Sequence, residues 1–206
     1  MATSSSIERI QELYIAYYGR PADPEGLEYW ATRLDESNGS LDEMINAFGT
    51  SSEFEERYGG QSLDELVNNL YQQSFDRDAE AEGLDYYVEL LTTGEASLAD
   101  IAVRILDGAQ NDDLAIIENK TIVAKSFTEQ VEASGREYAG NDAAEAAKAL
   151  LSEIKADGSS VGAQLGAISD FIAALPEEGG TVTPPSGGGG GGGGSIGGGG
   201  GSGGGG

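Results

Sequence analysis

Acidic side chains beside an arginine are the residues of this sequence whose spacing most clearly allows chemistry. Asp23 and Glu25 follow Arg20 in the pattern Arg-x-x-Asp-x-x-Gly, and their carboxylates could donate oxygens to calcium. The pattern differs from the twelve-residue helix-loop-helix calcium loop, which requires an acid or amide at alternate positions before its glycine. Asp23 can instead accept hydrogen bonds from the free amides that begin a helix. We expect this cap, with Arg20 paired to Asp23 or to the end of the preceding helix, and we keep calcium as the alternative.

Aromatic side chains offer a second chemistry, because tyrosine rings can stack on sugars. Tyrosines gather around residues 14–30 and again around residues 71–87. At helical spacing most of these rings belong to a core, and Trp30, the only tryptophan, is expected in a buried seam. Tyr18 and Tyr29 fall off the apolar faces, so we predict these two as glycan-binding residues. Paired carboxylates for glycoside hydrolysis carry no information, since 36 acids make such pairs common.

The composition argues against an enzyme. The chain has no histidine and no cysteine, which removes the commonest general base, the commonest zinc ligand and any thiol nucleophile. With 36 acidic and 11 basic residues the formal net charge is -25, which argues against nucleic acids and anionic membranes as partners. No stretch reaches the length of a membrane span, so we expect no membrane insertion. We therefore predict a non-enzymatic protein without a cofactor, with Ca²⁺ as the one cofactor kept open.

The residues around Arg20 recur 57 positions later, where residues 70–91 align without a gap on residues 13–34. The alignment pairs the loop residues Arg20, Asp23, Gly26 and Trp30 with Arg77, Glu80, Gly83 and Tyr87. An internal repeat of this length indicates a duplicated supersecondary unit. Glu80 is a weaker helix cap than Asp23, although its charge still lies near a helix N-terminus. We expect all eight loop residues to have structural roles.

Apolar residues at helical spacing predict about nine helices and no strand, which makes the fold class all-α. In each unit they predict one helix before the loop and two after it. A short turn over residues 51–54 is expected to close the first unit. Residues 111–133 predict one long helix with Leu114 among its inward residues. Two shorter helices are predicted to follow, over residues 142–156 and 159–175.

The repeat resembles a known bacterial domain. A Leu-Tyr pair, the stretch Arg-x-x-Asp-x-x-Gly-Leu-x-Tyr-Trp, a Gly-Ser break and a closing Ser-x-Glu-Phe are similar to a helical repeat of unassigned function found in large secreted RTX and S-layer-like proteins. Residues 7–110 match it in two copies. The second copy departs from it at Asp78, at Tyr87 and over residues 111–114, where the closing Ser-x-Glu-Phe is lost. The Asn-Lys-Thr stretch of residues 119–121 resembles the helix that follows these repeats in S-layer-type proteins. The resemblance implies type I export to the cell surface.

The C-terminal stretch has a different character, since residues 187–206 contain 17 glycines. The default interpretation of such a segment is a flexible linker. Ordering it costs roughly 1–2 kcal/mol per residue, and only backbone hydrogen bonds could offset that cost. Glycine helices with three residues per turn can bond side by side because no Cβ keeps them apart. We therefore predict a polyglycine-II-like assembly element. The residues assigned to assembly are Gly187, Gly190, Gly194, Ile196, Gly199 and Gly203.

These observations divide the chain into five segments and favour a structural role. The segments are helical repeat unit 1 (1–57), helical repeat unit 2 (58–110), C-terminal helices of the same domain (111–178), an extended connector (179–186) and the glycine-rich tail (187–206). We expect a secreted homopolymer that forms an extracellular filament, sheath or surface layer and is exported without an N-terminal signal peptide. The alternative is a module that binds cell-surface polysaccharide and uses the tail as a flexible spacer.

Each repeat unit is predicted to have only three short amphipathic helices, which is too small a core to be stable alone. We therefore predict that the two units pack together as related halves of one domain. A fragment of residues 1–57 should be unfolded by circular dichroism. A cooperative thermal melt of that fragment would contradict the prediction.

Overall fold

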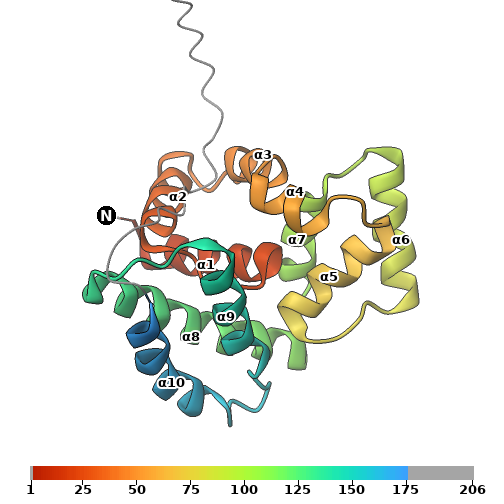
Figure 1. Cartoon of the computed structure of the whole chain (residues 1–206). Coiled ribbons are helices and arrows are strands. Elements are labelled where there is room, and N and C mark those ends of the chain that lie inside the picture. Colours follow the sequence, from red (N-terminus) through yellow and green to blue (C-terminus); the bar gives the residue numbers. More distant parts are fainter. Residues whose placement is uncertain (1, 176–206) are drawn as a thin grey trace, which may run out of the picture.

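The computed structural model describes residues 2–175, which form ten α-helices and no strand. The predicted all-α class is confirmed. In chain order the helices are α1 (Ser4–Tyr18), α2 (Pro24–Glu36), α3 (Asp42–Gly49), α4 (Ser52–Tyr58), α5 (Leu63–Phe75), α6 (Ala81–Thr93), α7 (Leu98–Asp107), α8 (Asn111–Ser134), α9 (Gly140–Ser152) and α10 (Val161–Ala174) (Figure 1). The predicted connector and glycine-rich tail lie outside the described residues.

Helix α1 is the centre of this arrangement, because it contacts α2, α5, α7 and α8 (Figure 1). Every residue from Leu13 to Tyr18 is buried, whereas a surface helix buries only one stripe. Thr3 caps the helix by accepting a hydrogen bond from Ser6 N at 3.3 Å. Gly19 ends it with a φ of 68°, a left-handed conformation that glycine adopts without steric cost. The second half of α1 is therefore part of the core on all sides.

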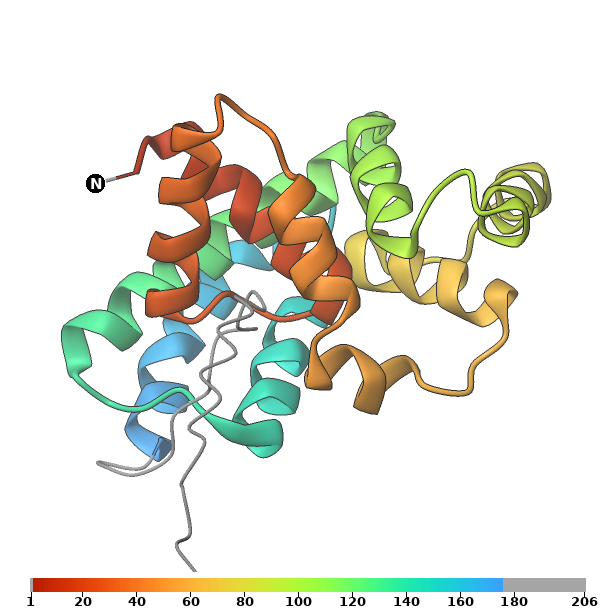
Figure 2. The same ribbon diagram turned by 90° about the horizontal axis from the view of Figure 1, so that it is seen from above.

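The chain contains two similar helical units that lie side by side (Figure 2). Unit 1 consists of α1–α4, and unit 2 consists of α5–α7 followed by the first turns of α8. Helix α1 packs against α5 and α7 of the other unit, and α3 also contacts α7. At the surface Arg9 of α1 forms an ion pair with Asp107 of α7 at 2.6 Å. The order of helices in unit 1 is thus repeated in unit 2, as the sequence repeat predicts.

Helix α8 connects the repeat units to the C-terminal helices. It is 24 residues long and contacts α1, α2, α5, α9 and α10. Its Phe127 is fully buried, with ring centroids 4.9 Å from Tyr138 and 5.1 Å from Phe171. The C-terminal part of the chain therefore packs on the repeat units and does not form a separate core. None of the ten helices is both long and apolar enough to cross a lipid bilayer.

Two sequence predictions about local structure were wrong. Residues 51–54 begin helix α4 and are not a turn, because Ser51 Oγ accepts a hydrogen bond from Phe54 N at 3.0 Å and so caps a seven-residue helix. Leu114 is 42% exposed although it was predicted to face inward. The neighbouring Asp113 faces unit 2, and consecutive helical residues point about 100° apart, so Leu114 turns toward solvent.

Candidate functional site

The arginine of the loop in unit 1 is buried and binds helix α4. Arg20 Nε donates to Glu53 Oε1 at 2.8 Å, and Arg20 Nη2 donates to Glu53 Oε2 at 2.7 Å. The remaining Nη1 donates to the Pro21 carbonyl at 3.0 Å. Arg20 is only 2% exposed. Burial alone would lower the pKa of Arg20, but Tyr138 and the Glu53 carboxylate raise it. The guanidinium therefore stays charged and ties the loop to α4.

Unit 2 repeats this arrangement with a different acid. Arg77 Nε donates to Asp113 Oδ1 at 2.9 Å and Arg77 Nη2 donates to Asp113 Oδ2 at 2.6 Å, while Nη1 donates to the Asp78 carbonyl at 2.9 Å. The acid follows its arginine by 36 residues here and by 33 in unit 1. The closing Ser-x-Glu-Phe is thus absent from the sequence of unit 2. Its ion pair is kept by Asp113, which lies three positions after the residue of unit 2 that aligns with Glu53.

The acids inside the two loops have different roles. Asp23 is the N-cap of α2, and its Oδ1 accepts from Gly26 N at 2.7 Å. Both predicted partners of Arg20, namely Asp23 and the end of the preceding helix, were wrong, because Arg20 binds Glu53 and the Pro21 carbonyl. In unit 2 Glu80 makes no side-chain cap and pairs with Arg77 at 2.9 Å. Short side chains are preferred as N-caps, which explains why only the aspartate fills that role.

A tyrosine and a glycine complete each loop. The Arg20 guanidinium lies 5.4 Å from the centroid of the Tyr14 ring, and Arg77 lies 5.2 Å from that of Tyr71. Burial raises the pKa of Tyr14 far above its ordinary value, so its hydroxyl stays protonated. This hydroxyl lies against Gly26, where an added Cβ would be only 2.5 Å from it. Gly26 is therefore required by the close approach of Tyr14.

One further hydrogen bond is common to both loops. Ala22 N donates to Gln11 Oε1 and Ala79 N donates to Asn68 Oδ1, each at 3.0 Å. Gln11 also donates to Thr128 Oγ1 of α8 at 2.8 Å. The principal polar contacts of the loops are thus directed to other parts of the fold.

The predicted ligand-binding residues have mixed outcomes. Tyr18 was predicted to lie off the apolar face, but it is fully buried, and its hydroxyl is 3.0 Å from Ser51 Oγ, because α4 covers this side of α1. Tyr29 is 40% exposed, with the Arg33 guanidinium 4.7 Å from its ring centroid. Glu25 is exposed, and residues 2–175 contain no group of three or more acids placed to hold a metal ion. Calcium binding at Asp23 and Glu25 stays a prediction.

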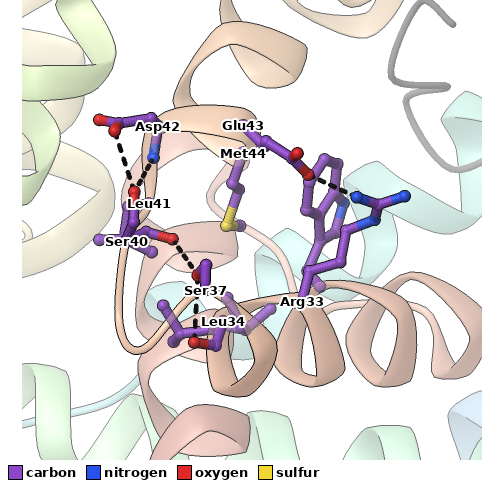
Figure 3. A pocket seen from close by; sticks show the side chains of 10 residues that line it. Arg33, Leu34, Ser37, Ser40, Leu41, Asp42, Glu43 and Met44 are labelled. Atoms are coloured by element: carbon purple, nitrogen blue, oxygen red, sulfur yellow. Dashed lines mark hydrogen bonds and ion pairs between the residues drawn. The ribbon is translucent and has the colours of Figure 1, made fainter.

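A cavity of about 210 Å³ lies in unit 1 between α2, α3 and the loop that joins them, and we call it the unit-1 cavity. Figure 3 shows Arg33 and Glu43 meeting in an ion pair, with 2.5 Å between Nη1 and Oε2. The hydrogen bond to Glu43 raises the pKa of Arg33. The lining residues are Ile10, Trp30, Arg33, Leu34, Ser37, Ser40, Leu41, Asp42, Glu43 and Met44.

Two hydrogen-bond donors of the unit-1 cavity are unused. Trp30 Nε1 and Arg33 Nε are both buried, and neither has a hydrogen-bond partner among the described residues. Trp30 is 2% exposed, as expected for a residue of the buried seam. Buried donors are nearly always hydrogen-bonded in proteins. The hydroxyls of Tyr14, Tyr17 and Ser74 are also unpaired among the described residues, but of these unpaired donors only Trp30 Nε1 and Arg33 Nε belong to residues that line the unit-1 cavity.

A second cavity, of about 190 Å³, lies where α5, α8 and α9 meet and contains an ion pair between the buried Lys120 and the partly exposed Asp76. Lys120 Nζ donates to the Gln73 carbonyl at 2.8 Å and to Asp76 Oδ1 at 2.9 Å. Burial raises the pKa of Asp76 and lowers that of Lys120. Because these two charges face each other, we assign the pair to the attachment of α8 to α5.

Helix periodicity and motif spacing did not indicate the unit-1 cavity. Its lining residues other than Ile10 lie within residues 30–44, and the polar ones are ordinary for a solvated helix end, so their types alone did not indicate a cavity. One signal was present in the alignment of the two units. Arg33 and Asp42 of unit 1 are replaced at the equivalent positions by Leu90 and Ala99 of unit 2. A comparison of the repeats for their differences would have pointed to this end of unit 1.

Comparison with known proteins identifies a family but no function. The family model described as "Domain of unknown function (DUF4214)" matches residues 2–58 and 45–114. These two matches together span more than half of the 206 residues. No curated protein and no solved structure shows a significant match.

The two loop glycines provide a matched test of the packing around the arginines. An alanine at position 83 would place its Cβ 3.5 Å from the Tyr71 hydroxyl, an ordinary contact, whereas at position 26 the distance to the Tyr14 hydroxyl is 2.5 Å. Gly83→Ala should therefore be neutral or stabilise by up to about 1 kcal/mol through helix propensity. Gly26→Ala should destabilise by about 1–3 kcal/mol. Urea unfolding of both variants measures the difference, and equal effects would contradict the close packing.

The two ion pairs differ in burial and should differ in energy. The Arg20 side chain is 3% exposed and that of Arg77 is 35% exposed. Glu53→Gln leaves a buried charge uncompensated and should cost about 3–5 kcal/mol of unfolding free energy. Asp113→Asn should cost about 1 kcal/mol, because water can solvate Arg77. The same urea titration compares them, and a larger loss for Asp113→Asn would show that the ranking is wrong.

Proposed function

The chain belongs to the DUF4214 family of domains of unknown function, and from this premise we propose that it is a non-enzymatic structural protein that assembles with itself at the bacterial cell surface. One observation carries this proposal. In both units the charged side chain that defines the loop is paired within the fold, Arg20 with Glu53 and Arg77 with Asp113. A motif whose arginines are committed to ion pairs supports a role in building a module, and gives no support to catalysis.

We propose that the helical part is displayed outside the cell and that the tail joins copies of the chain into a filament, sheath or surface layer. The resemblance to repeats of secreted RTX and S-layer-like proteins supports export by a type I system without an N-terminal signal peptide. The absence of histidine and cysteine supports a non-enzymatic role. Calcium is proposed only as an ion that screens the acidic surface or binds at Asp23 and Glu25.

Backbone hydrogen bonding is the interaction proposed to drive assembly. Ile196 is the only large residue of the tail, and burying it yields about 1.5–3 kcal/mol, far less than ordering the tail costs. Hydrogen bonds with a net value of roughly 0.5–1.5 kcal/mol each, repeated along the tail between several neighbours, are of the required size. The tail lies outside the described residues, so this proposal rests on the composition of residues 187–206.

A second candidate function is the binding of cell-surface polysaccharide, with the tail as a spacer. The observation that favours it is the exposed Tyr29 ring next to Trp30 and Arg33, two residues that line the unit-1 cavity. Tyr18 no longer supports this candidate, because it is buried.

Removal of the tail tests the first candidate. The full chain should form regular assemblies in negative-stain electron microscopy, whereas a chain ending at Pro185 should remain monomeric with an unchanged melting temperature. Assembly of the truncated chain would assign the contacts to the helices. If neither chain assembles, the structural proposal fails.

A substitution test then separates backbone pairing from side-chain contacts. Gly190→Val combined with Gly199→Val should abolish assembly, because each Cβ prevents the close approach of neighbouring tails. Ile196→Ala, which removes the only large side chain, should have a much smaller effect. If the double valine variant polymerises like the parent, backbone pairing is not the mechanism.

A further inference from the structure

We propose that the unit-1 cavity binds one ring of a neutral sugar, with Trp30 and Arg33 as its hydrogen-bond donors. The inference deepens the polysaccharide-binding candidate and rests on it. It is independent of assembly by the tail.

Two unpaired donors in the lining determine which ligand atoms the cavity can bind. Trp30 Nε1 and Arg33 Nε are covered atoms without a hydrogen-bond partner among the described residues; Trp30 is 2% exposed, whereas the Arg33 side chain as a whole is 42% exposed. Both residues line the same cavity. Leaving a buried donor such as Trp30 Nε1 unpaired is costly, and that cost is removed when a ligand supplies an acceptor oxygen; the cost is smaller for the partly exposed Arg33. A ligand suited to this cavity must therefore carry at least two acceptors.

The opposite side of the cavity supplies acceptors. Ser40 Oγ donates to Asp42 Oδ2 at 2.9 Å, and Ser37 Oγ donates to the Ser40 carbonyl at 2.9 Å (Figure 3). Ser40 Oγ also accepts from Asp42 N at 3.3 Å, so it keeps one lone pair that can accept, while the Ser37 oxygen keeps two. A ligand that donates and accepts at neighbouring atoms fits this surface, and sugar hydroxyls do both.

The apolar residues and the size define the rest of the ligand. Ile10, Leu34 and Met44 form a buried apolar part of the lining, which matches the C–H groups of a sugar ring. The volume of about 210 Å³ is below the range of roughly 300–1,000 Å³ that is typical of drug-sized ligands. The cavity therefore has room for a single ring, while the exposed Tyr29 beside it is available to the next one.

Charge selects a neutral ligand. The Arg33 guanidinium is already paired with Glu43, and Asp42 adds a second carboxylate to the lining. The chain as a whole has a formal charge of -25. An anionic sugar would meet this negative potential without a free cation to receive it. We therefore assign the cavity to neutral hexoses and N-acetylhexosamines and exclude uronic acids.

The only tryptophan of the chain lines the cavity, so its fluorescence reports occupancy. The full chain is titrated with methyl α-D-glucoside, methyl β-D-galactoside and N-acetylglucosamine, with sodium glucuronate and glycerol as comparison probes. At least one of the three neutral sugars should give a saturable change in emission and raise the melting temperature. No response to any of them, or equal responses to glucuronate or glycerol, would overturn the proposal.

Substitutions of Arg33 test whether the sugar binds in the unit-1 cavity. Arg33→Leu introduces the residue that unit 2 has at this position, Leu90, and should weaken sugar binding about tenfold through loss of a charged donor. Arg33→Lys keeps the charge but lacks Nε, and should weaken binding similarly. Arg104→Leu, an equal change of charge on an exposed residue of α7 outside the cavity, should leave binding unchanged. Circular dichroism melts establish that all three variants are folded.

The outcomes distinguish this inference from the proposed structural function. Unchanged sugar binding in both Arg33 variants would place the sugar elsewhere and overturn the site. Loss of binding in the Arg33 variants with normal filaments in electron microscopy would support the site and leave assembly to the tail. Filaments without any sugar binding would overturn this inference alone.

Discussion

A buried guanidinium must have its charge matched inside the protein, and this constraint determines the shape of unit 1. Arg20 is almost inaccessible to water, and moving such an ion out of water costs several kcal/mol unless an acid and further acceptors surround it. Glu53 and the Pro21 carbonyl provide them. Glu53 follows Arg20 by 33 residues, so the chain must fold back after α2 and α3 to bring α4 against the loop that contains Arg20. The ion pair thus holds the loop before α2 against the start of α4, the two ends of the segment that contains α2 and α3.

Unit 2 satisfies the same constraint but uses it to join the rest of the chain. In unit 1 the acid lies on α4, a helix of seven residues. In unit 2 the corresponding acid, Asp113, lies in the first turn of α8, which continues to Ser134 and packs along α1. The closing helix of one unit is therefore also the helix that covers the centre of the other. This shared use of α8 makes the two repeats and the C-terminal helices interdependent.

The sequence predicted what depends on local pattern. Helix periodicity and the 57-residue repeat located nearly every helix and the cap at Asp23. Local pattern could not supply the partner of Arg20, because Glu53 is distant in the chain. Local pattern also predicted Tyr18 at the surface, because helix periodicity assigns only one apolar face to α1. In the structure α4 covers a second face of α1 and buries Tyr18. Helix periodicity could not predict the unit-1 cavity for a related reason, since the cavity is the space that remains between α2, α3 and their loop after packing.

The distribution of charge is compatible with the two kinds of contact proposed for this protein, which are contacts between tails and contacts with a neutral sugar. Basic residues that form ion pairs with acids in the described structure include Arg9, Arg20, Arg33, Arg77, Lys120 and Lys125. The 36 acids far outnumber all 11 basic residues, so the helical surfaces of two copies repel one another within a Debye length of about 10 Å at 0.1 M salt. The tail contains no charged residue after Glu178, which allows tails to approach where helical parts cannot. A neutral sugar is not repelled by the acidic helical surface either. Both proposed partners, the tail of another copy and a neutral sugar, can therefore bind without electrostatic repulsion.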